Sequence, residues 1–174
     1  MNANKRELKK QLQLYFSAVC SDVKDVTAVT NQYYKSLTIT APRKANNGSM
    51  SNLPIVIQGG MGVGISDWRL ARAVSRLGQL GVVSGTALDQ VLARRLQAGD
   101  PGGEMRRALR EFPFPLMAER VWQTYYIPGG KPELASYKTL PTHSQDSPRE
   151  LKELCIVANF VEVFLARQGH SNPV

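Results

Sequence analysis

The sequence predicts an α/β fold built on parallel strands, and two observations support this prediction. The apolar run Leu53–Gln58 ends in a glycine-rich turn, and a second apolar run, Leu80–Gly85, follows a segment with helical periodicity. A strand–helix–strand unit of this kind builds a parallel sheet. Proteins with such sheets bind ligands at the loops that follow the strands, so the glycine-rich turn is the first candidate site.

Residues 1–52 are predicted to form an N-terminal extension rather than part of the sheet. Apolar residues at helical spacing predict a helix over Asn4–Val23. The stretch Ala41–Asn52 is polar and rich in helix breakers, which is typical of a linker. The α/β region is therefore predicted to span residues 53–174.

Helix caps define the elements that follow Leu53. Ser66 or Asp67 is expected to cap a helix that ends at Gly78. Thr86 and Asp89 resemble a capping box for the next helix, which is expected to end at Gly99.

The second half of the chain is predicted to return to the sheet once. Helices are expected from Asp100 to Phe112 and from Leu116 to Tyr126, followed by an irregular loop over residues 132–146. A capping box over Ser147–Glu150 predicts a short helix, a third strand over Leu154–Asn159, and a last helix over Phe160–Gln168.

The glycine-rich turn does not match either common nucleotide-binding motif. Its glycines are Gly59, Gly60, Gly62 and Gly64. The third glycine of a dinucleotide fingerprint is replaced by Ile65 or Asp67, and Ile65 also stands where a P-loop has its lysine. Two interpretations remain: a backbone cradle for a flat cofactor, or a tight turn without a ligand.

Composition points away from several classes of partner. The net charge is +8, but the arginines and lysines recur on predicted helices, as expected of solvated helix faces. We find no nucleic-acid-binding motif and no apolar run of the roughly 18 residues that a membrane span needs. We therefore expect a cytoplasmic protein that binds neither nucleic acid nor membrane.

Few residues suggest catalysis by themselves. Cys20 and Cys155 show no metal-ligand spacing and are expected to be buried free thiols, and no metal site is predicted. His143 and His170 lie in predicted loops without an identifiable partner, so we expect them to be exposed and assign no catalytic residue. An aromatic group is expected to pack rather than to flank a substrate: Trp122, Tyr125 and Tyr126.

Several segments together resemble the nitronate monooxygenase (2-nitropropane dioxygenase-like) family, whose relatives include flavin-dependent enoyl-acyl-carrier-protein reductases. The resemblance covers residues 53–174. It is carried by Ile57–Gly62, Trp68–Asp89, Ala93–Gly103, Met117–Trp122 and Val157–Ala166.

The resemblance implies an FMN-bound (β/α)8 barrel that oxidises alkyl nitronates with O2, or reduces an enoyl thioester with NAD(P)H. By position, the residues implied to line the flavin are Gln58, Gly59, Gly60, Met61, Ser84 and Gly85. Asn159, at the end of the predicted third strand, is implied either to contact the flavin or to cap the next helix; alternatively, the matching asparagine lies just beyond Val174.

The chain departs from this family in length. A complete barrel has about 250 residues, whereas residues 53–174 offer three predicted strands. We therefore expect a partial TIM-type (β/α) barrel of about three parallel strands, truncated, inactive alone and unable to retain FMN. A small-molecule substrate is expected only in the complete enzyme, and the bare sheet edge could bind a protein partner without catalysis.

Overall fold

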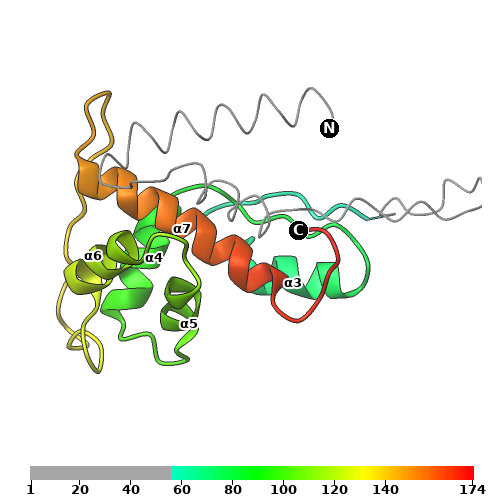
Figure 1. Ribbon diagram of the computed structural model, residues 1–174, viewed down its shortest axis with the longest axis horizontal. Helices are drawn as coiled ribbons and strands as arrows, with labels where there is room; N and C mark the ends of the chain where they lie inside the picture. The colour runs from blue at the N-terminus through cyan, green and yellow to red at the C-terminus, as the bar shows by residue number, and fades with distance from the viewer. Residues whose placement is uncertain (1–55) are drawn as a thin grey trace, which may run out of the picture. The chain divides into compact units, whose positions relative to one another are not determined.

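The computed structural model describes residues 56–174, and this part of the chain is helical (Figure 1). The predicted helix and linker of residues 1–52 lie outside the described residues. Five helices occur in residues 56–174: α3 (Trp68–Arg76), α4 (Leu88–Gln97), α5 (Glu104–Arg110), α6 (Pro115–Tyr125) and α7 (Arg149–Arg167).

Helix α3 begins and ends where its sequence predicts. The Asp67 carboxylate accepts hydrogen bonds from the backbone N–H groups of Arg69 and Leu70, which satisfies two of the free donors of the first turn. At the other end, Gly78 has a φ of 76° and its N–H donates to the carbonyl of Ser75. This left-handed conformation favours glycine and stops the helix.

The ends of helices α4 and α5 are also set by a glycine and an aspartate, except that the start of α4 has no side-chain cap. Gly99, with a φ of 88°, ends α4, and both oxygens of Asp100 accept from the first turn of α5. The predicted capping box at Thr86 is wrong, because α4 begins at a left-handed Ala87 and has no side-chain cap. Asp89, the expected partner of Thr86, instead contacts His143.

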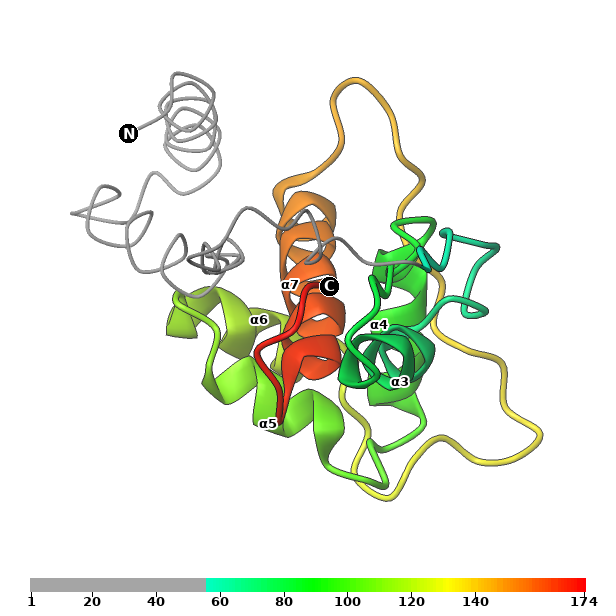
Figure 2. The ribbon, with the colours of Figure 1, turned by 90° about the vertical axis from the view of Figure 1, so that its right-hand side faces the viewer.

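Helix α7 lies at the centre of the helical assembly and packs against α3, α4, α5 and α6 (Figure 2). Its apolar residues recur at helical spacing and are fully buried, among them Leu151, Leu154, Val157, Val161 and Leu165. The loop between α6 and α7 is irregular, as predicted. The capping box predicted at Ser147 is wrong, because its hydroxyl donates to the Ser144 carbonyl and the α7 cap is Pro148.

The predicted partial barrel of parallel strands is wrong for residues 56–174. The segment Leu154–Asn159 lies inside α7, because its neighbours on both sides continue the same buried helical face. In the other two predicted strands, the described residues are joined by a single isolated parallel bridge between Ile57 and Leu80. The bare sheet edge expected to bind a partner therefore does not occur in the described part of the chain.

The bridge nevertheless brings the two predicted ligand loops together. Gln58 donates its N–H to the carbonyl of Leu80, and Leu80 donates to the carbonyl of Val56. The segment after α3 thus runs beside the segment before it, as in a strand–helix–strand unit, but the pairing does not extend into strands. None of the described helices is long and apolar enough to cross a membrane.

Candidate functional site

The loop before α3 is folded around one buried hydroxyl group. The Ser66 oxygen accepts hydrogen bonds from the Gln58 amide and the Met61 N–H, each at 3.0 Å. The same hydroxyl donates to the carbonyl of Gly59 at 3.3 Å. Ser66 therefore fixes the shape of the Gln58–Ser66 loop, a role that the sequence did not predict.

Side chains and backbone also fasten this loop to the segment Val82–Gly85. The Gln58 side-chain oxygen accepts from the Val82 N–H at 3.2 Å. The Ser84 N–H donates to the Ser66 carbonyl at 2.9 Å. Six of the predicted flavin-lining residues thus lie on two adjoining segments, which we call the paired loops: residues 58–66 and 82–85.

The glycines of the paired loops fall into two groups. Gly64 has a φ of 70°, so the turn itself explains why glycine stands there. Gly59, Gly60, Gly62 and Gly85 have no left-handed φ. A Cβ at Gly59 or Gly85 would meet nothing within 4 Å, and one at Gly60 or Gly62 would meet a side chain at an ordinary 3.8 or 4.0 Å. Neither backbone conformation nor packing requires glycine at these four positions.

Apolar side chains surround this open backbone. Met61, Val63 and Ile65 are 48%, 50% and 60% exposed, although they are large and apolar. Exposed apolar side chains gathered on one short loop are typical of a surface that a ligand or a partner covers.

Asn159, the seventh predicted flavin-lining residue, lies outside the paired loops. It lies on α7, and its side-chain amide donates to the carbonyl of Cys155 one turn earlier at 2.8 Å. The expectation that it ends a third strand fails together with that strand.

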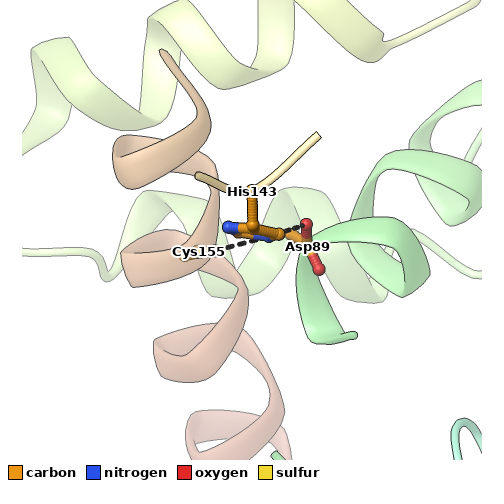
Figure 3. Close-up of side chains that lie close together, drawn as sticks. All are labelled: Asp89, His143 and Cys155. Carbon is orange, nitrogen blue, oxygen red and sulfur yellow. Dashed lines mark hydrogen bonds and ion pairs between the residues drawn. The ribbon is translucent and has the colours of Figure 1, made fainter. Parts of the chain in front are cut away.

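A second cluster joins three elements that are distant in the sequence (Figure 3). Nε2 of His143, on the loop between α6 and α7, lies 2.9 Å from Asp89 Oδ2 on α4. The same nitrogen lies 3.9 Å from Cys155 Sγ on α7. His143 is exposed on a loop, as expected, with a side chain that is 57% exposed, but it has a partner that the sequence did not identify, a carboxylate that is only 5% exposed.

The electrostatics of this cluster keep its thiol neutral. Burial, reinforced by the negative charge of Asp89, raises the pKa of Cys155 to about 11. Cys155 is a free thiol, as predicted, and is half-buried.

Comparison of the chain with protein-family models, curated proteins and solved structures finds no match. The functional assignment therefore depends on the paired loops, on the Asp89–His143–Cys155 cluster and on the sequence resemblance.

Of the predicted aromatic group, Tyr125 is buried as a packing residue would be, whereas Trp122 and Tyr126 are partly exposed and Trp122 lines a surface cavity. Trp122 stacks on Tyr126 with ring centres 3.8 Å apart, and Tyr125 is buried. The guanidinium of Arg106 covers both stacked rings, at 4.8 Å from the centre of Trp122 and 5.5 Å from that of Tyr126.

Proposed function

We propose that this chain supplies flavin-lining loops to an FMN-dependent oxidoreductase of the nitronate monooxygenase type, which oxidises alkyl nitronates with O2. The observation that carries this proposal is the uncrowded backbone at Gly59, Gly60 and Gly85, where a Cβ would meet nothing within 4 Å or, at Gly60, only ordinary contacts. Glycine allows another molecule to approach the backbone closely, and these three glycines have no other evident role.

The residues present fit the ring system of a flavin. The paired loops offer bare backbone at the glycines and exposed apolar side chains at Met61, Val63 and Ile65. A flat, largely apolar ring with polar edges suits such a surface. When bound, the flavin would supply the redox chemistry, while these residues would hold the ring and shield it from water.

The internal hydrogen bonds of the paired loops favour binding without a large rearrangement. Because Ser66 and Gln58 already fix the loop backbone, little conformational entropy is lost when the ring binds. Recognition of the ring alone predicts that riboflavin and FMN bind with similar affinity, since they differ only in the phosphate.

The test is a titration of the full chain with riboflavin and with FMN, read from the quenching of flavin fluorescence. We expect saturable but weak binding of both, too weak for the chain to retain FMN during purification, with dissociation constants within about threefold of each other, or about 0.7 kcal/mol. Gly60→Val should weaken both by at least about tenfold, because its side chain would occupy the space of the ring. Arg76→Ala, on the exposed face of α3, is the matched control and should bind like the wild type.

Two results would contradict the proposal. One is the absence of saturable binding by the wild-type chain, and the other is wild-type affinity in Gly60→Val. Thermal melts of the flavin-free variants show whether a loss of binding reflects a loss of fold.

A second candidate function is binding of a protein partner without catalysis. Val56 and Ile57, which directly precede the paired loops in the chain, are also large, apolar and 55% and 64% exposed. Sedimentation of the chain with and without riboflavin separates the two functions. Self-association that riboflavin does not change would favour the protein interface, whereas dissociation by riboflavin would favour a shared flavin surface.

A further inference from the structure

The Asp89–His143–Cys155 cluster is not arranged for nucleophilic catalysis. In a relay of thiol, imidazole and carboxylate, the two partners bind opposite nitrogens of the imidazole. Here Nε2 of His143 faces both the carboxylate and the sulfur. One nitrogen cannot donate a proton to Asp89 and accept the proton of Cys155 at the same time.

Three lone-pair donors that converge on one point are instead the arrangement of a metal centre. We propose that Asp89, His143 and Cys155 bind a divalent cation of the zinc class. Their donor atoms all lie within 4.8 Å of one another, one oxygen, one nitrogen and one sulfur. Zinc binds these three kinds of atom at about 2.0–2.3 Å, which places neighbouring ligand atoms about 3.3–3.7 Å apart in a tetrahedral site.

Small side-chain movements would close this site. The nitrogen and sulfur, 3.9 Å apart, need to approach slightly, and the nitrogen and oxygen, 2.9 Å apart, need to separate slightly. The oxygen and sulfur lie within 4.8 Å of each other and also need to approach, which side-chain rotation of Asp89 and Cys155 on α4 and α7 can supply, while His143 adjusts on its exposed loop.

The donor set discriminates between classes of metal. Thiolate and imidazole favour zinc and similar transition metals, whereas magnesium and calcium prefer oxygen ligands alone. On binding, the S–H bond of Cys155 is replaced by a metal–sulfur bond and the proton passes to the solvent, with no change in oxidation state. The raised pKa of the thiol opposes this step, and the charge of the cation drives it.

Other ionisable groups surround the site. Burial, together with the charges of Asp89 and Glu150, raises the pKa of Tyr125 on α6. The ammonium group of Lys138 lies 5.6 Å from the centre of the Tyr125 ring. A cation would offset the cost of forming the Cys155 thiolate beside the negative charge of Asp89.

A metal ion at this place would tie the loop between α6 and α7 to both helices. The three protein ligands leave a fourth position, which a water molecule can fill on the exposed side of His143. Because the ion binds the folded chain, it should stabilise the fold by mass action. This site is separate from the proposed flavin surface, so either proposal can fail without the other.

The experiment uses Co²⁺ as a spectroscopic probe, added to the reduced full chain. We expect about one equivalent to bind and to produce thiolate-to-cobalt charge-transfer absorption, which Zn²⁺ then abolishes by displacement. Cys155→Ser should abolish that absorption, and His143→Ala and Asp89→Asn should weaken binding by about 10–100-fold. Cys20→Ser and His170→Gln, which alter the other cysteine and the other histidine, should bind like the wild type.

Thermal melts supply a second measurement on the same proteins. Zn²⁺ should raise the Tm of the wild type and of both control variants, and should not raise that of Cys155→Ser. Absence of the charge-transfer band in the wild type, or its persistence in Cys155→Ser, would overturn the proposal.

Discussion

The helical assembly around α7 and the paired loops are built by different means. The buried residues of α7 contact four other helices, and apolar packing determines its structure. The paired loops lie beside this assembly with exposed apolar side chains, and hydrogen bonds from Ser66 and Gln58 hold them. The first region is therefore stabilised by burial, and the second keeps its shape while its surface remains open.

Glycines illustrate the same difference. Gly81 is buried where the chain crosses α3, and a Cβ there would lie 2.0 Å from the carbonyl oxygen of Ala71. Gly60 is exposed, and a Cβ there would meet ordinary contacts. Glycine at position 81 is thus required by the fold, whereas glycine at position 60 requires another explanation, for which we propose the flavin.

The largest effect is expected in the centre of the helical assembly. Leu154→Ala should destabilise the protein by about 2–5 kcal/mol, because it removes a fully buried side chain and leaves a cavity. Urea unfolding followed by circular dichroism measures this loss. A cost below about 1 kcal/mol would mean that Leu154 is not in the core.

A somewhat smaller loss is expected at the crossing of α3. Gly81→Ala should cost about 1–3 kcal/mol or more, because the backbone carbonyl of Ala71 must move to admit the methyl group. The same unfolding experiment applies. Wild-type stability in this variant would contradict the close approach of the two segments.

An ion-pair network on α7 should give a pH-dependent effect. The buried Glu153 carboxylate accepts from Arg120 at 2.7 and 2.9 Å and from Arg149 at 2.8 Å. Burial by itself favours the neutral acid, but these arginines lower the pKa of Glu153 below 4.5. The contribution of the Glu153 carboxylate to the free energy of unfolding is therefore present above pH 4.5, and it is lost as the pH falls through the lower pKa of the folded state.

Glu153→Gln should accordingly lower the free energy of unfolding by about 1–2 kcal/mol at pH 7, and by less in acid. The loss is modest because both guanidinium groups are half-exposed.

Glu162, on the same helix, should behave in the opposite way. Burial raises its pKa, although Arg95 and the Trp68 N–H oppose this, so its stabilising contribution is present below pH 4.5 and is lost as the pH rises. Unfolding free energies of both glutamine variants from pH 3 to 7 should therefore change in opposite directions relative to the wild type.

The smallest effect on stability is expected in the paired loops. Gly60→Ala should change the free energy of unfolding by no more than about 0.5 kcal/mol, because its methyl group meets only ordinary contacts. A large loss, comparable to that of Gly81→Ala, would mean that the fold itself requires glycine at position 60.

Local signals in the sequence predicted the helices α3 to α6 and several of their ends, whereas the predicted parallel-strand fold is wrong for residues 56–174. The Asp67 cap and the Gly78 and Gly99 helix ends depend on residues within one turn of each other, so the sequence pattern identifies them correctly. The strand predicted at Leu154–Asn159 failed because a short apolar run fits both a strand and a helix that is buried on several sides. Its continuation into Val161 and Leu165 at helical spacing was the signal that could have corrected it.

The sequence indicated the paired loops but not the Asp89–His143–Cys155 cluster, because only the paired loops depend on residues that are close in the chain. Gln58 meets Leu80 and Val82 across the segment that carries α3, a local connection that a sequence pattern can indicate. The Asp89–His143–Cys155 cluster depends on how a long loop closes on two helices, and its members follow no recognisable spacing. Only the packing of α4 against α7 brings its ligand atoms together.

The most direct test of the central claim compares both regions in one experiment. In amide NMR spectra of the full chain titrated with riboflavin, we expect shifts confined to residues 58–66 and 82–85, with the buried residues of α7 unchanged. The same titration of Gly60→Val should leave these signals unmoved. Shifts centred on α7, or an unchanged spectrum of the wild type at saturating riboflavin, would contradict the assignment of the paired loops as a flavin surface.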